Sequence, residues 1–407
     1  MFAPEKNQVI KLHKTLLNGI ATALSQIFNE NRYSDKVLER LFKQNKQWGS
    51  RDRKFVAEAV YDIVRYYRLL SHLAESKNNF WFITAVYLVL KEIELPDWPE
   101  FKHVNKQLIQ NKFNEAKSNF ALFQSYPDNI NELCIKEVGK DTWEREAAAM
   151  NEIAEVVIRV NTLKTNSKKL QEELAKDDIE SYAIQHVPNA LGLKKRSNIF
   201  SNRNFKDGLF ELQDSGSQEI GLCTGAEPKQ TVIDACAGAG GKSLQLAALM
   251  QNKGRIISMD VTQWKLDELN KRAKRAGVHN LETRLIEGSK TISALKDKAD
   301  VLLLDVPCSG LGVLKRNPDT KWKFNKEIFD KTRTLQQQIL SEYAVMVKPG
   351  GTLVYSTCSI LPSENREQVN TFLQNNKIFE FVDDRTIYPS EGYDGFYMCK
   401  LKRKNSI

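Results

Sequence analysis

The first 126 residues carry a helical pattern of apolar positions. Apolar residues recur at i, i+3, i+4 and i+7 over residues 9–28 and 52–73, and strand-like alternation is absent there. The longest apolar run, residues 80–90, is too short to cross a bilayer, so it predicts a buried helix. Two prolines within residues 95–99 interrupt the pattern. We therefore expect an all-helical domain over residues 1–126.

Residues 127–215 mix strand and helix signals after a Tyr-Pro-Asp turn. The segments VVIRVNTL (156–163), YAIQHV (182–187) and GLFELQD (208–214) have strand character, whereas SKKLQEELAKD (167–177) has helical character. This order predicts a small α+β module over residues 127–215.

From residue 216 to 407 we expect a third domain, because strands alternate with helices from residue 229 onward. Strands are predicted at 231–236, 255–260, 281–286, 300–306 and 351–357. The longest helix, 325–347, should end at the Lys-Pro-Gly-Gly stop that follows it. Segments 380–384 and 396–402 fit an antiparallel pair at the sheet edge. The pattern predicts an α/β fold with a doubly wound, mostly parallel sheet.

The charge of the chain points to a polyanionic partner. The 407 residues include 60 Lys and Arg against 51 Asp and Glu, which gives a net charge of +9. Basic clusters occur at 164–169, 194–206, 271–275 and 400–404. Each cluster alone is most simply a solvated face, but four of them make a nucleic acid the first partner to consider.

The cellular compartment follows from the N-terminus and the cysteines. Charged residues stand where a signal peptide would need an apolar core, so we expect a cytoplasmic protein without a membrane anchor. The six cysteines are far apart and include no C-x-x-C pair. This spacing favours reduced thiols over a disulfide framework or a zinc site, and no metal is expected.

A glycine-rich loop, DACAGAGGKS (234–243), follows a predicted strand and opens a helix. A Walker loop would need glycine at Cys236, and a dinucleotide fingerprint would need glycine at Ser243. A methyl-donor site needs close glycines and a ribose-binding carboxylate after the second strand, and Asp260 stands there, 20 residues after Gly240. S-adenosylmethionine fits this loop best, while a turn that only packs a helix remains the alternative.

Two further strands end in cysteine motifs, DVPCSGLG (305–312) and YSTCSILPSEN (355–365). In a doubly wound sheet these strand ends meet at one crevice, although Cys308 and Cys358 are 50 residues apart. A single cysteine is most simply a small buried apolar residue. Two cysteines at neighbouring strand ends predict thiol chemistry on one substrate.

Pyrimidine methylation explains why two thiols would be useful. A thiolate that adds to carbon 6 makes carbon 5 nucleophilic, and a general base must later remove the C5 proton. A free cysteine with a pKa of ~8.5 is only about 3% thiolate at pH 7, so a helix N-terminus or Lys242 would have to activate it. Asp305 could hold a proton at N3 of the base, or it could simply cap a turn.

The motifs DACAGAGGK, DVPCSGLGVLKRNPDTKW and YSTCSILPSENREQV resemble the signature motifs of Sun/RsmB-type RNA cytosine-C5 methyltransferases, the NOL1/NOP2/Sun family. The ordered similarity runs from residue 213 to residue 396. Residues 150–165 are similar to the small domain that precedes the catalytic domain in this family. Residues 51–65 are more weakly similar to the helical, NusB-like extension of the RsmB branch.

The resemblance implies specific roles for the site residues. Cys358 would be the nucleophile and Cys308 would assist product release, although DNA cytosine methyltransferases attack with the cysteine of a Pro-Cys motif, which makes Cys308 the rival nucleophile. Lys242 and Asp305 would position the pyrimidine. The residues expected at the cofactor are Cys236, Ala237, Gly238, Gly240, Gly241, Lys242, Asp260, Lys265, Ser289 and Asp305. Those expected on the RNA side of the cleft are Arg316, Asn317, Pro318, Asp319 and Trp322.

Two positions depart from the family pattern. Lys265 replaces an arginine that commonly follows the ribose-binding acid, so the charge is kept without the planar guanidinium. Ser289 stands where an acidic residue usually contacts adenine. Adenine recognition is therefore the part of the site that the resemblance supports least.

These observations predict an S-adenosylmethionine-dependent RNA cytosine-C5 methyltransferase that acts as a monomer. The NusB-like extension favours 16S rRNA, and tRNA is the alternative substrate. A catalytically silent RNA-binding assembly factor and a P-loop ATPase are the rivals from other classes. We expect RNA to contact the middle module and the basic tail, and the target cytosine to leave its stack.

Overall fold

The computed structural model describes residues 2, 12–196 and 199–405, and these divide into two compact units. One unit contains the described residues up to 153 together with 314–324, and the other contains 154–313 and 325–405. The start of the helix expected at 9–28, most of the charged N-terminal segment, and residues 197–198 of a basic cluster lie outside the described residues. Each unit is described below by itself.

The first unit is helical, as its periodicity predicts. Asparagines cap α5, α6 and α7, because the side chains of Asn79, Asn105 and Asn119 each accept a hydrogen bond from a backbone N–H in the first turn. Its main helices are α1 (Lys14–Phe28), α2 (Ser34–Gln44), α3 (Ser50–Arg65), α4 (Tyr67–Leu73), α5 (Phe80–Leu90), α6 (Lys106–Ala116), α7 (Phe120–Phe123), α8 (Asp128–Val138) and α9 (Lys140–Met150).

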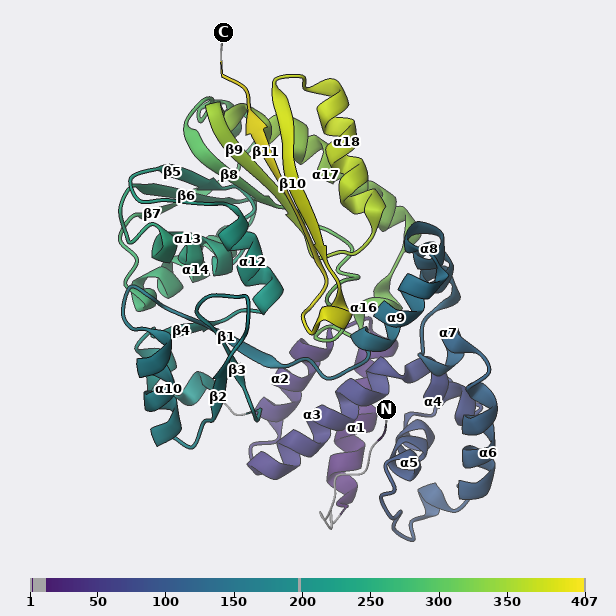
Figure 1. Ribbon diagram of the computed structural model, residues 1–407. Helices are drawn as coiled ribbons and strands as arrows, with labels where there is room; N and C mark the ends of the chain where they lie inside the picture. Colours follow the sequence, from purple (N-terminus) through teal and green to yellow (C-terminus); the bar gives the residue numbers. More distant parts are fainter. Residues whose placement is uncertain (1, 3–11, 197–198, 406–407) are drawn as a thin grey trace. The chain divides into compact units, whose positions relative to one another are not determined.

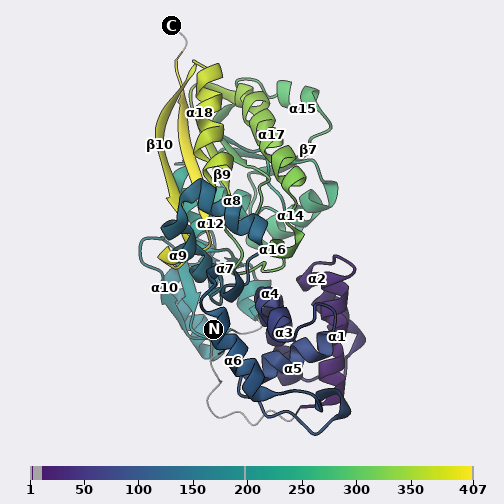
Figure 2. The ribbon, with the colours of Figure 1, turned by 90° about the vertical axis from the view of Figure 1, so that its right-hand side faces the viewer.

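Two details of this unit differ from the sequence-based expectation. The helix expected over 52–73 is interrupted at Tyr66, whose φ of −110° and ψ of 24° leave the helical region. Helices α8 and α9 were not predicted, and Gly139, with φ +82°, separates them. The core forms where α1 packs against α3 and α5 (Figure 2), with Leu17, Ile20 and Val60 fully buried.

The second unit begins with the small α+β module. Its antiparallel sheet has the strand order β2-β3-β1-β4, and α10 covers it through Leu170 and Leu174. The elements are β1 (Val156–Val160), α10 (Ser167–Lys176), β2 (Ser181–Ala183), β3 (Ala190–Leu193), α11 (Arg203–Lys206) and β4 (Phe210–Leu212). The strand expected at 182–187 is shorter than predicted because the chain turns at His186 and Asn189, both with positive φ. Strand β3, which follows this turn, was not predicted.

The rest of the unit is the expected doubly wound α/β fold, which is Rossmann-like (Figure 1). In the described residues the sheet has seven strands in the order β10-β11-β9-β8-β5-β6-β7. Strands β5 to β9 pair in parallel, whereas β11 and β10 form the predicted antiparallel edge pair. The strands are β5 (Thr231–Asp234), β6 (Arg255–Asp260), β7 (Leu281–Leu285), β8 (Ala299–Asp305), β9 (Val347–Thr357), β10 (Phe379–Ile387) and β11 (Phe396–Arg403).

Alternating side chains of the strands face two helical layers. Ile233, Leu302 and Tyr355 point into one core with α17 and α18, whereas Val232 and Leu303 point into the other with α12 and α13. The helices are α12 (Ser215–Cys223), α13 (Gly241–Leu249), α14 (Gln263–Ala276), α15 (Ser289–Ser293), α17 (Lys326–Tyr343) and α18 (Arg366–Asn375). This layering is the reason that the buried strands read as continuous apolar runs.

One boundary in this fold was predicted too late. The helix expected to run to residue 347 ends at Tyr343, a 3-10 turn (Ala344–Met346) follows, and β9 already begins at Val347. The Pro-Gly-Gly stretch forms an irregular start of the strand, because Ala299 pairs with Val347 whereas Val301 pairs with Thr352. The carboxyl ends of β5, β8 and β9, which are consecutive neighbours in the sheet, carry the glycine loop and the two cysteine segments.

Candidate functional site

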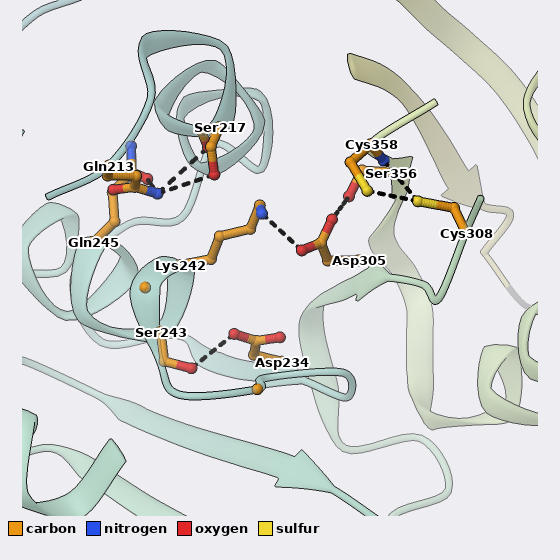
Figure 3. Close-up of polar contacts among 12 residues, drawn as sticks. Gln213, Ser217, Asp234, Lys242, Ser243, Gln245, Asp305, Cys308, Ser356 and Cys358 are labelled. Atoms are coloured by element: carbon orange, nitrogen blue, oxygen red, sulfur yellow. Dashed lines mark hydrogen bonds and ion pairs between the residues drawn. The ribbon is translucent and has the colours of Figure 1, made fainter. Parts of the chain in front are cut away.

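The two cysteines meet at the carboxyl ends of neighbouring parallel strands. Asp305 of β8 pairs with Ser356 of β9, so the segments that follow start side by side. The Sγ atoms of Cys308 and Cys358 are 2.7 Å apart, and the backbone N–H of Cys358 donates to Sγ of Cys308 at 3.1 Å (Figure 3). Both are free thiols. The structure thus brings together the two thiols that the sequence places 50 residues apart.

The surroundings make the two thiols unequal. The hydrogen bond with Cys358, then burial, then the charges of Cys358 and Glu364 raise the pKa of Cys308 well above its usual value. Two adjacent thiols do not ionise together in a poorly solvated site, because the second negative charge is repelled by the first. The raised pKa therefore keeps Cys308 protonated beside Cys358.

An ion pair lies beside the cysteines. Nζ of Lys242, in the first turn of α13, is 2.6 Å from Oδ2 of Asp305, whose Oδ1 accepts a hydrogen bond from Ser356 Oγ at 3.0 Å (Figure 3). Burial lowers the pKa of Lys242, but the charge and hydrogen bond of Asp305 outweigh it and the pKa is raised. A charged, hydrogen-bonded chain therefore connects the glycine loop with the strand that carries Cys358.

The glycine loop between β5 and α13 combines a tight packing contact with open space. Gly240 has φ +88°, and a Cβ there would lie 2.5 Å from Leu269 Cγ on α14. A Cβ at Gly238 or Gly241 would meet no atom within 4 Å. Gly240 is thus required for helix packing, whereas Gly238 and Gly241 border space in which a ligand can approach the backbone.

Carboxylates surround this space. Asp260 ends β6 and accepts hydrogen bonds from the backbone N–H groups of Gly238 at 3.0 Å and Thr262 at 2.9 Å. Lys265 Nζ lies 3.6 Å from Asp260 Oδ1. Burial, then the charges of Asp234, Asp305 and Asp260, raise the pKa of Cys236 well above its usual value, so it remains a thiol.

Sequence reasoning missed Asp234, although it starts the glycine-loop motif. Its Oδ2 accepts a hydrogen bond from Ser243 Oγ at 2.7 Å (Figure 3), whereas no residue that the structure describes donates a hydrogen bond to its buried Oδ1. Burial raises the pKa of Asp234 to about 6, although the bond from Ser243 lowers it. A bound ligand with a cationic or N–H group could donate a hydrogen bond to this oxygen.

The remaining predicted residues are on α15 and within residues 314–324. Ser289 is exposed in the first turn of α15, after β7, two strands away from β5 in the sheet. Residues 314–324 belong to the helical unit, where Trp322 Nε1 donates to Val64 O at 2.7 Å and Asp319 accepts from the backbone N–H of Ser34 at 3.0 Å. The segment expected to shape the RNA side of the cleft therefore has a packing role within the helical unit that the motif did not reveal.

Several basic residues of the small module and of α14 form hydrogen bonds or ion pairs with other residues of the chain. Arg159 is buried and donates to Gly241 O at 2.7 Å and to Gln213 Oε1 at 2.6 Å, so the module directly contacts the glycine loop. Glu211 of β4 accepts from both Arg272, at 2.9 Å, and Arg275. Part of the 271–275 cluster, expected to be solvated or RNA-bound, thus holds the module onto α14. Arg159 lies in a strand without any motif, so no sequence signal marked it.

The described residues, 2, 12–196 and 199–405, contain no helix with the length and apolar character needed to cross a membrane. Within the same ranges, no group of three or more His, Cys, Asp or Glu side chains is arranged to hold a metal ion.

Comparisons with known proteins agree with the sequence motifs. Residues 223–402 match a family described as 16S rRNA methyltransferase RsmB/F, and residues 126–200 match the ferredoxin-like domain of RsmF/B-like methyltransferases. The chain is 28% identical to the probable ribosomal RNA small subunit methyltransferase B of Synechocystis sp., covering 93% of this chain and 97% of that relative. It is 26% identical to the probable enzyme of the same name from Bacillus subtilis, covering 97% and 100%.

Solved structures show the same fold. The crystal structure of PH0851 superposes with a TM-score of 0.81 at 22% identity, covering 97% of this chain and 100% of that chain. A methyltransferase homolog from Pyrococcus horikoshii superposes with a TM-score of 0.62 at 26% identity, covering 70% and 98%. Residues 126–200 and 223–402 thus match, in order, the ferredoxin-like and methyltransferase domains of the RsmB/F family, and the two relatives are similar along nearly their whole length.

Proposed function

We propose that this protein transfers a methyl group from S-adenosylmethionine to C5 of a cytosine in RNA, with 16S rRNA as the substrate. The observation that carries the proposal is the pair of thiols of Cys308 and Cys358, 2.7 Å apart, beside the Lys242–Asp305 ion pair. A pair of thiols at one site fits a reaction that needs covalent attack and a later proton transfer. The names of the relatives support rRNA as the substrate.

The glycine loop and its carboxylates fit S-adenosylmethionine. The open space above Gly238 and Gly241 admits a ligand against the backbone. Asp260 can accept hydrogen bonds from the ribose hydroxyls of the cofactor. Asp234 Oδ1, to which no described residue donates, can accept from the cofactor's ammonium group. An archaeal structural neighbour was solved with SFG, a cofactor analogue. When bound, the cofactor supplies an electrophilic methyl group on a positively charged sulfur. Lys265 and Ser289 remain proposed contacts to the ribose side and the adenine.

Cys358 acts as the nucleophile in this account. Its thiolate adds to C6 of the cytosine, a C–S bond forms, and the electron pair of the C5–C6 double bond becomes available at C5. The raised pKa of Cys308 supports Cys358 as the nucleophile, because Cys308 retains its proton beside Cys358. The S–H of Cys308 can donate to the Cys358 thiolate, which stabilises the charge before attack.

Cys308 acts after the methyl group is in place. The C5 proton is then transferred to a base, the C5–C6 double bond re-forms and the C6–S bond breaks, so that Cys358 leaves as a thiolate. Once Cys358 is bound to C6, its negative charge no longer opposes ionisation of Cys308. Cys308 can then lose its own proton to solvent and, as a thiolate, accept the C5 proton, which suits a role in product release.

The Lys242–Asp305 pair orients the pyrimidine. Lys242 is held as an ammonium by Asp305, and Ser356 fixes the other oxygen of that carboxylate. Asp305 can hold a proton at N3, which makes C6 more electrophilic toward the thiolate. We propose that the protein acts as a monomer.

We also propose that residues 1–126 and 127–215 bind RNA and that residues 216–407 form the catalytic domain. In the middle region Phe200 is 60% exposed, and exposed cations such as Lys195 and Arg203 lie nearby in the chain. Exposed aromatic rings among cations are suited to stacking on unpaired bases. RNA affinity is therefore expected to fall steeply with salt.

Methyl transfer with nucleoside analysis tests the proposal. Purified protein is incubated with labelled S-adenosylmethionine and unmodified 16S rRNA or tRNA, and the RNA is digested to nucleosides. Label in 5-methylcytidine from 16S rRNA, absent with Cys358→Ala, is expected. Label only in tRNA would change the substrate, and label in another nucleoside would overturn the chemistry. Folded protein that does not bind the methyl donor in calorimetry would indicate a silent RNA-binding factor.

A further inference from the structure

A short turn after β9 holds the segment that carries Cys358. This turn, η4 (Pro362–Glu364), leads directly into Asn365, which is buried. Asn365 Oδ1 accepts from Thr357 Oγ1 at 2.5 Å, and its Nδ2 donates to Ser359 O at 2.9 Å. Asn365 therefore fixes the residues on both sides of Cys358.

Glu364, one residue earlier, holds the segment that carries Cys308. Its Oε1 accepts from the backbone N–H of Ser309 at 2.7 Å, and its Oε2 accepts from Ser309 Oγ at 2.6 Å. Gln336 Nε2, from α17, donates to Oε1 of Glu364 at 3.1 Å and to Pro307 O at 2.9 Å. The residues before and after Cys308 are thus held by two side chains that also contact each other.

The chemistry of these contacts is unusual for a buried acid. Glu364 is 0% exposed, and the donors named above are an amide N–H, a hydroxyl and a carboxamide, all of them neutral. Both of its oxygens accept hydrogen bonds. A carboxylate in such surroundings disfavours a second negative charge nearby. The pKa of Cys308 is raised most by the hydrogen bond to Cys358, then by burial and by the charge of Cys358, and Glu364 makes a smaller contribution in the same direction.

We propose that Glu364 is a positioning residue, whose carboxylate holds the Pro307–Ser309 turn so that the thiol of Cys308 faces Cys358 without competing with it as a nucleophile. The inference rests on the proposed function for the roles of the two cysteines, and it names the group that keeps those roles apart. Glu364 belongs to the motif YSTCSILPSEN, but the sequence does not show that its side chain contacts Ser309, in the segment that carries Cys308.

Thiol alkylation of the free protein provides a test that needs no RNA. Glu364→Gln removes the charge at nearly constant shape, and Glu367→Gln, an exposed position on the following helix, is the matched control. Wild type and both variants are treated with iodoacetamide, and each cysteine is followed by peptide mass spectrometry. We expect Cys308 to react about tenfold faster in Glu364→Gln than in Glu367→Gln, the equivalent of one pKa unit. Equal rates for Cys308 in the two variants would overturn the proposal.

Adduct kinetics provide the second readout. In Glu364→Gln the covalent adduct with RNA should form at nearly the wild-type rate, because Asn365 still holds the Cys358 segment, but it should be released more slowly and accumulate. Equal slowing of formation and release would reduce Glu364 to a general structural role and contradict the proposal. If the wild type forms no adduct and transfers no methyl group, the proposed function fails, and alkylation of Cys308 alone decides the role of Glu364.

A third variant covers the case in which Glu364→Gln does not fold. Glu364→Asp keeps the charge and withdraws the carboxylate by one methylene, which loosens the turn at Ser309. Faster alkylation of Cys308 than in Glu367→Gln would support the positioning role. An unchanged rate would contradict it.

Discussion

Lys242 and Asp305 form an ion pair of 2.6 Å that joins the glycine loop to the end of β8. The same strand carries a second such pair at its other end, where Asp300 contacts Lys348 at 2.8 Å. The two pairs share chemistry and strand, but only the first lies at the edge of the sheet where the cysteines meet. Their comparison separates a role in the reaction from a role in the fold.

The proposed orientation of the pyrimidine predicts different outcomes for the two lysines. Lys242→Met should lower the rate of methyl transfer by about 100-fold, because a charge that fixes the reacting group is lost. Lys348→Met should leave the rate within about twofold of the wild type, since that pair is distant from the chemistry. Single-turnover methyl transfer measures both. Similar losses in the two variants would show that Lys242 acts only through stability.

Two neighbouring glycines should separate stability from cofactor binding. Gly240→Ala should destabilise the fold by about 2 kcal/mol, because the residue has φ +88° and its Cβ would clash with Leu269. Gly241→Ala should leave unfolding within about 0.5 kcal/mol of the wild type but weaken S-adenosylmethionine binding about tenfold, because its Cβ enters the open space above the loop. Chemical denaturation and calorimetry measure the two quantities. Unchanged cofactor affinity in Gly241→Ala would contradict the proposed site.

The buried Asp234 predicts a pH-dependent stability. Its pKa is raised from 3.8 to about 6, so between these values the folded state binds more protons than the unfolded state. Stability contributed at this site is therefore highest below pH 3.8 and falls as pH rises, by about 3 kcal/mol once the group is ionised above pH 6. Asp234→Asn removes this cost.

The variant Asp234→Asn should consequently be more stable than the wild type at pH 8, and the difference should shrink as pH falls toward 4. Asp300→Asn is the control of opposite sign. Burial raises the pKa of Asp300, but its hydrogen bonds from Lys348 and Thr231 lower it overall, so removal of this charge should cost stability at pH 8. Urea unfolding across this pH range measures both variants. A pH-independent difference between Asp234→Asn and wild type would contradict the assignment.

The helices and strands that were predicted correctly are those whose pattern is set by residues close together in the chain. Periodicity identified α1 and the alternating strands and helices of the α/β fold, and the uninterrupted apolar run at 80–90 identified α5, because one apolar face or one buried segment suffices to show the pattern. The meeting of Cys308 and Cys358 was predictable because neighbouring parallel strands end at one edge. Boundaries were less accurate, as at Tyr66 and Val347, where tertiary contacts and a bulge override local signals.

Residues whose importance comes from long-range contacts were not predictable. Arg159 reaches the carbonyl of Gly241, 82 positions away, and Glu364 reaches Ser309 across 55 positions, yet neither belongs to a pattern with a period. Trp322 shows the same limit. It follows the cysteine motif in the chain and is expected near RNA, and the motif did not reveal that it also donates a hydrogen bond to Val64 within the helical unit. A motif gives the order of residues but not the partners that burial selects.

Glu211 should be important for the attachment of the small module. Glu211→Gln leaves the partly buried Arg272 and Arg275 without their charge partner, so we expect a loss of about 2 kcal/mol in unfolding free energy. Glu282→Gln, which breaks an exposed pair with Arg255, is the matched control and should cost less than about 0.5 kcal/mol. Chemical denaturation compares the two. Equal small losses would show that the pairs with Glu211 do not stabilise the module.

The roles of the two cysteines are the central claim, and trapping of the covalent intermediate tests them most directly. Cys308→Ala and Cys358→Ala are expressed separately in cells, and denaturation-resistant complexes of protein with RNA are isolated and their RNA sequenced. If Cys358 attacks and Cys308 releases, Cys308→Ala accumulates an adduct with small-subunit rRNA and Cys358→Ala does not. An adduct with Cys358→Ala alone would reverse the two roles, and the absence of an adduct in both variants would contradict covalent catalysis.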